Sequence, residues 1–249
     1  MGVDNSSSMH DQGTVAQFTI PSAEVKETNP PSLSTSFLWE FFLDGRTPAR
    51  AMSDAAMRLL LPSLGGPGTI IELGAASNYY KDFVPLNQRY LTSDISNKCD
   101  LQLDMTRLDL DNNSVDALVS VFALEHLYSF DAVFEECKRV LKPKGRFLLV
   151  VPFLYYYHAA PDDFFRFTSS ALDRLLTPLD ILIRQPLGGR GLLFSEFLHE
   201  KVNMGSVRSK VARLALRCVA LPFLATGLST HDARYAFAFV YLCEKRPSA

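Results

Sequence analysis

The sequence predicts an α/β fold of the doubly wound type, in which a mostly parallel seven-stranded sheet carries helices on both faces. Short apolar segments alternate with segments of helical periodicity from Thr69 onward, as is typical of parallel sheets. Residues 146–151 are almost entirely apolar, which indicates a strand covered on both faces. Strands are expected at residues 69–73, 89–93, 100–103, 117–122, 146–151, 181–185 and 235–243.

Helices are expected between these strands and before them. Residues 130–141 keep apolar side chains at helical spacing and end at a Lys-Pro-Lys-Gly turn. A shorter helix is expected at 170–176. Upstream, one helix begins within 37–43, and a second covers 50–61 and ends at Pro62.

The chain is expected to have three parts. Residues 1–33 are rich in Ser, Thr, Asn and Pro and predict a disordered arm. Residues 34–65 form N-terminal helices, and residues 66–249 form the α/β domain, with its core at 66–187 and a helical insertion at 188–233. In that insertion 207–228 predicts a helix, basic near its start and broken or kinked at Pro222. We favour a packed helix with a solvated basic side, and contact with a membrane surface is the alternative.

The amino-acid composition limits the classes of binding partner that we expect for this protein. The 249 residues include 25 basic and 27 acidic side chains, a formal charge of −2, so a nucleic-acid partner is not expected. The four cysteines are scattered without a C-x-x-C pair, which gives no support to a zinc site or a thiol–disulfide motif. Neither a signal-peptide pattern nor a long apolar span is present, and a cytoplasmic location is expected. The sequence carries no signal for oligomeric state.

An acid-x-Gly motif ends the first strand of the domain. Glu72 precedes Gly74 by two positions, and glycine permits a tight turn and a close approach of the backbone to a ligand. A helix capped by Ser77 is expected to follow and to present its N–H groups to an anionic group. On its own this motif is common.

Acids also stand where the next two strands end. Asp94 follows the second strand, where a carboxylate accepts hydrogen bonds from ribose hydroxyls in nucleotide-binding folds. The alternative is an exposed acid in a turn. Asp104 ends the third strand, where it is placed to accept from an adenine amino group while Met105 packs on the ring.

These motifs, followed by L-E-H at 124–126 and R-V-L-K-P-K-G at 139–145, resemble the class I S-adenosylmethionine-dependent methyltransferases, specifically the type 11 group. The resemblance covers residues 69–152, with a looser fit to 244. It implies a Rossmann-like fold with S-adenosylmethionine as cofactor. It also implies that the cofactor is lined by Glu72, Gly74, Asp94, Asp104 and Met105, with backbone near Ala123 closing one side.

The chain departs from the family pattern in three positions. Ala76 and Asn78 replace the second and third glycines of the loop. Ala76 adds a methyl group where the cofactor lies close to backbone, and Asn78 suits the position if it needs a positive φ. Lys144 replaces a glycine before the fifth strand.

The loop after the fifth strand is the expected acceptor side, because ligands of open α/β sheets sit beyond the carboxyl ends of the strands. It carries Tyr157, His158, Asp162, Asp163 and Arg166. Its pattern, P-F-x4-H-x2-P-x-D-[FY]-x-R-[FY]-T, resembles methyltransferases found beside glycan and natural-product biosynthesis enzymes. That resemblance implies a small-molecule or glycan acceptor in a biosynthetic reaction.

A general base would help an alcohol or phenol acceptor to attack the activated methyl group. We expect His158 to be this base, with His126 as second candidate. Asp163 or Asp162 would orient the imidazole, and the predicted acceptor-binding residues are Tyr157, Asp162 and Arg166. The scheme requires no metal ion, and the sequence offers no acid cluster that we can assign as ligands.

Each of these residues also has a structural interpretation. In that interpretation His158 hydrogen-bonds a loop carbonyl, and Asp163 and Arg166 form a pair that holds the loop. The tyrosines at 155–157 then serve only packing, and His126 only begins a helix. For the whole chain the alternatives are a protein or RNA methyltransferase and a non-catalytic binding protein of this fold. A nicotinamide-dependent oxidoreductase is disfavoured because residues 74–79 lack G-x-G-x-x-G.

Overall fold

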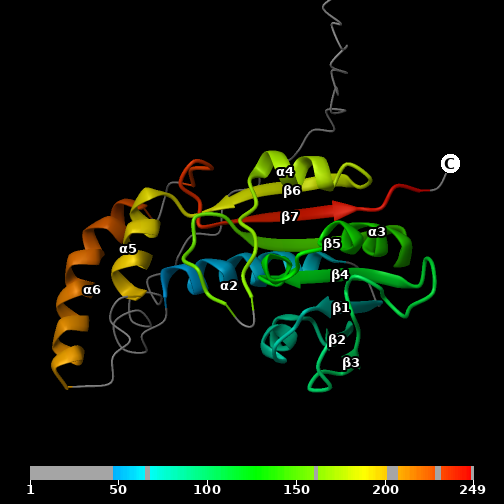
Figure 1. The fold of residues 1–249 in the computed structure, drawn as a ribbon, viewed down its shortest axis with the longest axis horizontal. Coiled ribbons are helices and arrows are strands. Elements are labelled where there is room, and N and C mark those ends of the chain that lie inside the picture. Colours follow the sequence, from blue (N-terminus) through cyan, green and yellow to red (C-terminus); the bar gives the residue numbers. More distant parts are fainter. Residues whose placement is uncertain (1–46, 65–67, 160–161, 201–206, 228–230, 248–249) are drawn as a thin grey trace, which may run out of the picture.

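The structure, a computed structural model, describes residues 47–64, 68–159, 162–200, 207–227 and 231–247. It contains one seven-stranded sheet in the order β3-β2-β1-β4-β5-β7-β6 (Figure 1). The strands from β1 to β5 pair in parallel, and β7 is antiparallel to both of its neighbours. Their bounds are β1 Thr69–Leu73, β2 Arg89–Asp94, β3 Leu101–Gln102, β4 Val115–Val121, β5 Leu141–Pro152, β6 Asp180–Leu187 and β7 Ala238–Glu244. The predicted fold class is confirmed, and every predicted strand corresponds to an observed one.

Alternate residues of the central strands enter two separate apolar cores. In β5, Phe147 and Leu149 join the core under α3 (Asp131–Val140) and α4 (Ser169–Leu175). Leu148 and Val150 join the core on the opposite face. All four side chains are fully buried. This two-sided burial is why the strand is an unbroken apolar run in the sequence.

The second face is covered by α2 (Pro48–Leu60), followed by the 3-10 turn η2 (Leu61–Leu64). The Thr47 hydroxyl accepts from the backbone N–H of Arg50, and Pro48 takes the first turn, where no intrahelical N–H bond is lost. This matches the helix predicted at 50–61. The arm at 1–33 and the helix predicted within 37–43 lie outside the described residues.

The connection between β1 and β2 differs from the prediction. A 3-10 helix of five residues, η3 (Tyr79–Phe83), replaces the expected helix, and its N-cap is Asn78 rather than Ser77. Asn78 has a φ of −81°, so this position does not need the positive φ that asparagine tolerates. Its side-chain oxygen accepts from the Thr92 hydroxyl of β2 at 2.8 Å, and this bond ties the loop to the sheet. Lys144, by contrast, has a φ of +64°, the conformation that favours glycine at this position of the family pattern.

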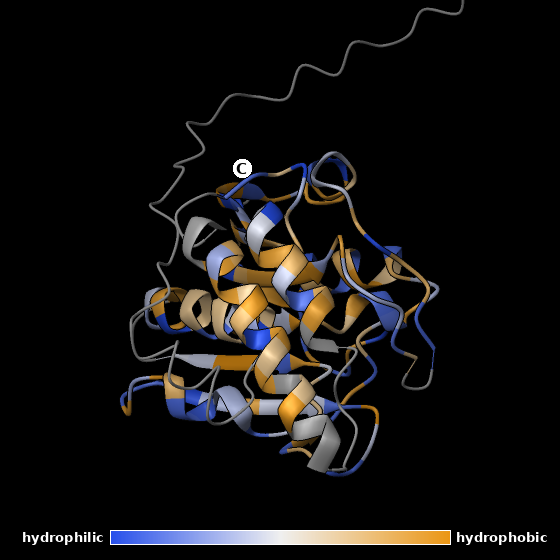
Figure 2. Cartoon of the chain, turned by 90° about the vertical axis from the view of Figure 1, so that its left-hand side faces the viewer, coloured by the Kyte–Doolittle hydropathy of each residue, from blue (hydrophilic) through white to orange (hydrophobic). Residues whose placement is uncertain are grey.

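The insertion forms two helices, α5 (Arg190–Glu200) and α6 (Val207–Gly227), at the carboxyl end of β6. Figure 2 looks onto this end, where the pair lies in front of the sheet. α6 passes through Pro222 as one helix rather than breaking there. The ring centroids of Phe223 in α6 and Phe194 in α5 lie 4.5 Å apart. Packing against α5 therefore supports α6 at this point. The basic side chains at the start of α6 lie outside the described ones.

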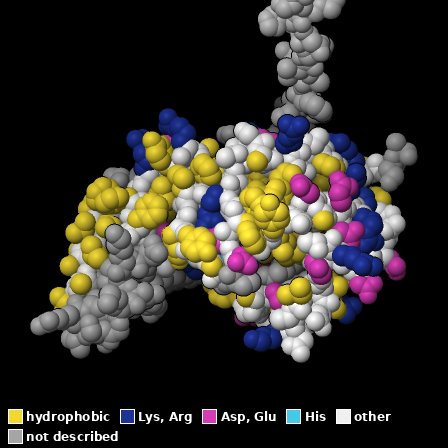
Figure 3. All heavy atoms as spheres, in the orientation of Figure 1, with side chains coloured by type: hydrophobic (Ala, Val, Ile, Leu, Met, Phe, Trp, Pro, Cys, Tyr) yellow, Lys and Arg dark blue, Asp and Glu magenta, His cyan; other side chains and the backbone are white. Residues whose placement is uncertain are grey.

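Several apolar side chains are exposed on this helix pair, as Figure 3 shows. They are Phe194, Phe197, Val211, Leu214, Val219 and Phe223. None of the described helices is both long and apolar enough to span a membrane.

A buried hydrogen bond joins the insertion to the core. The Glu196 carboxylate of α5 accepts from the backbone N–H of Ala49 at 2.9 Å, and Glu196 is only 2% exposed. The bond satisfies an N–H group in the first turn of α2 that has no partner within its own helix. The insertion is therefore anchored to the domain through α2.

We expect Glu196→Ala to lower the free energy of unfolding by about 1–3 kcal/mol, because it leaves a buried N–H group without a partner. Urea unfolding followed by circular dichroism measures the change. The exposed Glu135 of α3 offers the control Glu135→Ala, which should change stability by less than about 0.5 kcal/mol. Equal effects of the two substitutions would contradict the anchoring role of Glu196.

Candidate active site

The carboxyl ends of β1 and β4 meet at Gly74. This residue has a φ of +71°, and a Cβ atom built there would lie 2.7 Å from both the Ala123 Cβ and the Met105 Cε atoms. Only glycine fits without displacing these neighbours. Three residues that sequence reasoning assigned to the cofactor thus lie together, although they come from three separate loops.

Glu72 lies buried just before this turn. One carboxylate oxygen accepts from the Tyr90 hydroxyl of β2 at 2.7 Å. Burial raises the pKa of Glu72 to about 7, while the Tyr90 hydrogen bond and the positive charge of Arg50 act in the opposite direction. A carboxyl group in this position is half ionised at neutral pH and responds to any cation placed beside it.

Asp94 and Asp104 stand at the same edge of the sheet. Asp94 Oδ1 accepts from the Ser96 N–H at 2.7 Å, and Asp104 Oδ1 accepts from the N–H and the hydroxyl of Thr106. Each carboxylate therefore uses one oxygen to close its own turn. Within the described part of the chain, no hydrogen bond involves the second oxygen of either residue, and Ala76 is exposed in the adjacent loop.

Sequence reasoning missed that α2 packs close to the carboxyl edge of the sheet. The Arg50 guanidinium lies 4.0 Å from the centre of the Tyr79 ring, and the Tyr79 hydroxyl donates to Asp54 at 2.5 Å. Arg50 and Asp54 form an ion pair one helical turn apart. Nothing local in the sequence signals these contacts, because they depend on how α2 packs on the sheet.

A carboxylate and two imidazoles converge where β4 and β5 end. Glu125 and His126 belong to the short 3-10 turn η4 (Leu124–His126), and His158 lies in the loop after β5. Glu125 Oε1 is 3.9 Å from the Nε2 atoms of both histidines, and the two rings are 5.2 Å apart. We call these residues the Glu125–His126–His158 cluster. Sequence reasoning selected both histidines but gave Glu125 no role, although Glu125 belongs to the L-E-H motif at 124–126.

Arg166 organises the loop that carries His158. Its guanidinium makes five hydrogen bonds: two to the Asp163 carboxylate and one each to the backbone carbonyls of Tyr155, Tyr156 and Phe165. These bonds use all five N–H groups of the side chain. The geometry therefore favours the structural pair over the predicted contact of Arg166 with the acceptor.

Asp163 links this pair to His158. Its side chain is fully buried, and hydrogen bonds from Arg166 hold its pKa at about 2. Asp163 Oδ2 accepts from the His158 backbone N–H at 2.9 Å and lies 3.3 Å from His158 Nδ1, which suits the predicted orienting role. The carbonyl of Asp162 faces His126 Nδ1, whereas Tyr157 is 73% exposed.

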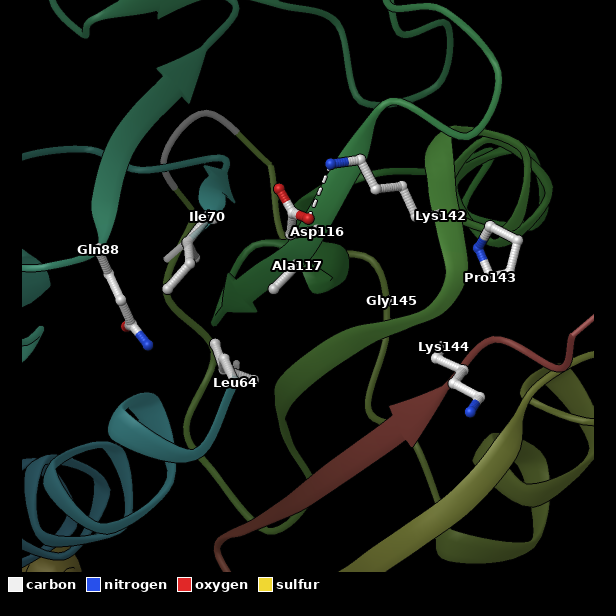
Figure 4. A pocket seen from close by; sticks show the side chains of 10 residues that line it. Leu64, Ile70, Gln88, Asp116, Ala117, Lys142, Pro143, Lys144 and Gly145 are labelled. Carbon is white, nitrogen blue, oxygen red and sulfur yellow. Dashed lines mark hydrogen bonds and ion pairs between the residues drawn. The ribbon is translucent and has the colours of Figure 1, made fainter. Parts of the chain in front are cut away.

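A separate hollow of about 210 Å³ lies at the opposite edge of the sheet. Figure 4 shows it between the starts of β1, β4 and β5, with Lys142 paired to Asp116 at 2.8 Å. Asp116 also accepts from the Thr69 N–H, so its carboxylate holds the starts of β1 and β4 together. This hollow is remote from the carboxyl ends of the parallel strands and contains none of the predicted site residues.

Comparison with known proteins agrees with this arrangement. Residues 72–149 match the family model described as "Methyltransferase domain", whereas no curated protein matches the chain significantly. Among solved structures, a geranyl diphosphate methyltransferase in complex with S-adenosylmethionine is 12% identical (TM-score 0.53) and covers 78% of this chain and 86% of its own.

Two further structures share the fold. The Burkholderia thailandensis 1,6-didemethyltoxoflavin-N1-methyltransferase, bound to its substrate and S-adenosylhomocysteine, is 14% identical (TM-score 0.50) over 85% of this chain and 87% of its own. The [4+2]-cyclase SpnF is 16% identical (TM-score 0.52) over 78% of this chain and 82% of its own. The family match spans β1 to β5 and includes Glu72, Gly74, Asp94 and Asp104. Residues 72–149 therefore match a methyltransferase domain, and the chain shares its fold with methyltransferases solved with S-adenosylmethionine or S-adenosylhomocysteine bound.

Proposed function

We propose that the enzyme methylates a hydroxyl group of a small-molecule or glycan acceptor, of the kind made in natural-product biosynthesis. The observation that carries this proposal is the Glu125–His126–His158 cluster. It begins two residues after Ala123, which contacts Gly74, so the cluster lies next to the donor residues. The proteins of similar fold named above include two methyltransferases whose names specify small molecules, which supports the same acceptor class.

On the donor side, each residue has a role that its position allows. The Glu72 carboxylate attracts the methionyl ammonium group, Asp94 accepts from the ribose hydroxyls, and Asp104 accepts from the adenine amino group. Met105 packs on the adenine ring, and the loop backbone at Ala76 lies along the ligand. The unused oxygens of Asp94 and Asp104 support these assignments.

On the acceptor side, the sulfonium is already activated, so the protein has to align the nucleophile and receive its proton. The acceptor oxygen attacks the methyl carbon, the sulfur–carbon bond breaks, and S-adenosylhomocysteine leaves. His158 Nε2 takes the hydroxyl proton, with His126 as the second candidate. Asp163 holds the His158 ring in place, and Tyr157 and Asp162 line the acceptor's approach.

The proposal is tested with a panel of hydroxylated small molecules incubated with the enzyme and S-adenosylmethionine. The expected result is release of S-adenosylhomocysteine together with a product that carries a new methoxy group by NMR. Methylation at nitrogen or carbon alone would overturn the hydroxyl assignment.

We expect His158→Gln to lower turnover at least 100-fold, the usual contribution of a positioned proton acceptor. Affinity for S-adenosylhomocysteine should stay within about twofold, because His158 belongs to the acceptor side. His231, which contacts the Pro186 carbonyl and the Gly188 N–H at the β6–α5 connection, provides the matched control His231→Gln. Unchanged turnover of His158→Gln at saturating acceptor would show that the assignment is wrong.

We expect donor affinity to depend on the ionisation of Glu72. Its raised pKa, about 7, leaves it mostly protonated at pH 6 and mostly ionised at pH 8, and only the ionised form attracts the ligand's ammonium group. The Kd for S-adenosylhomocysteine should therefore rise about tenfold from pH 8 to pH 6. Calorimetry measures it, with Glu135→Gln as control. Glu72→Gln should bind more weakly and lose this slope; an identical slope in the two proteins would contradict the role of Glu72.

A further inference from the structure

We propose that the Glu125–His126–His158 cluster binds one divalent transition-metal ion. Its ligands would be Glu125 Oε1 and the Nε2 atoms of His126 and His158. The three residues each offer one ligand atom within 4.8 Å of those of the other two, and Glu125 Oε1 lies 3.9 Å from both Nε2 atoms. The set offers two imidazole nitrogens and one carboxylate oxygen. These ligands suit Zn²⁺, Co²⁺, Fe²⁺ or Mn²⁺ better than Ca²⁺ or Mg²⁺, which prefer oxygen ligands only.

The first argument is the tautomer that each imidazole must adopt. His126 Nδ1 faces the carbonyl oxygen of Asp162. His158 Nδ1 lies 3.2 Å from the Tyr156 carbonyl oxygen and 3.3 Å from Asp163 Oδ2. A ring nitrogen beside an acceptor carries the proton, so each Nε2 atom presents a lone pair. Metal-binding histidines show this same arrangement, in which the second nitrogen donates to a carbonyl or carboxylate.

The second argument is that three lone-pair atoms then face one another. Glu125 Oε1 lies 3.9 Å from each Nε2 atom, which exceeds the length of a hydrogen bond. A single shared proton would join only two of the three atoms. A cation among them turns their mutual repulsion into attraction toward a common centre.

The third argument is the state of Glu125. Its side chain is fully buried, and neither carboxylate oxygen has a hydrogen-bond partner among the described residues. Arg166, whose positive charge acts on Glu125, is already paired with Asp163. A buried carboxylate without a partner is costly, and a metal ion would supply the missing counter-charge.

The spacing requires little adjustment. With bonds of about 2.1 Å, tetrahedral ligands lie about 3.4 Å apart, so small side-chain rotations bring atoms at 3.9 Å into range. Three protein ligands leave at least one position open at the carboxyl end of β4, beside Ala123. An acceptor hydroxyl at that position would lose its proton to solvent water more easily, because the imidazole nitrogens would be occupied by the metal. In metal-free protein an imidazole would receive this proton instead.

Metal binding is tested directly, without an acceptor. Full-length protein is freed of metal by dialysis against a chelator and then titrated with Co²⁺, with Zn²⁺ as competitor, by equilibrium dialysis and visible absorption. The expected result is one Co²⁺ ion per chain, with a ligand-field band that Zn²⁺ abolishes. Glu125→Gln and His126→Gln should each weaken binding at least 100-fold.

Two controls separate the cluster from adventitious ligands. Cys218 is exposed, and Cys218→Ser should leave binding unchanged, as should His231→Gln. Circular dichroism and thermal melting confirm the fold of every variant. Absence of stoichiometric Co²⁺ binding, or binding that survives both cluster substitutions, would overturn the proposal.

The metal-site proposal and the proposed function can fail separately, and the experiments distinguish the two cases. Hydroxyl methylation by metal-free protein that binds no Co²⁺ would leave the proposed function standing and remove the metal site. Co²⁺ binding lost in Glu125→Gln, without any methoxy product, would support the metal site and remove the acceptor assignment.

Discussion

The close approach of Gly74 to Ala123 and Met105 sets the geometry of the whole catalytic edge. Because there is no room for a Cβ atom at Gly74, the turn after β1 packs directly against the side chains of Met105 and Ala123, from the turns after β3 and β4. The parallel register places Leu73 of β1 beside Ser120 of β4, so the two strands leave the sheet at the same level. Because Ala123 precedes Glu125 by two residues, this contact also fixes how far the acceptor cluster lies from the donor loop.

The acceptor side depends on a buried charge pair in a similar way. Arg166 binds both Asp163 oxygens and three backbone carbonyls, so the loop after β5 is held by strong, charge-assisted hydrogen bonds rather than by regular secondary structure. The Phe164 N–H also donates to the Glu125 carbonyl at 2.8 Å. These bonds place His158 opposite His126. Residues that resembled substrate ligands in sequence thus position the two imidazoles.

The sequence predicted the sheet well because burial on both faces leaves apolar runs such as β5. It also predicted the acids at the carboxyl edge, since parallel strands bring their ends to one side. It did not predict that η3 would replace a helix, because that outcome depends on the bond between Asn78 and Thr92. Glu125 and the contacts of Arg50 were missed for a related reason: their partners lie far away in the chain. Family motifs located the loop at Gly74, whereas the position of His158 beside Glu125 depends on how residues 153–159 and 162–168 fold.

Two buried carboxyl groups lie near the contact between Gly74 and Ala123: Glu72 precedes Gly74 and Glu125 follows Ala123, each by two residues. Burial raises the pKa of each to about 7. A fold gains little by burying such groups for stability alone, because their charged forms lose hydration. In the proposed site, both would become favourable when a cation arrives: the donor's ammonium beside Glu72, and a metal ion beside Glu125. Ligands that bind only the folded chain stabilise it, so donor and metal would each relieve a cost that the empty site carries. On this proposal one buried acid serves each half of the reaction: Glu72 two residues before Gly74, and Glu125 two residues after Ala123.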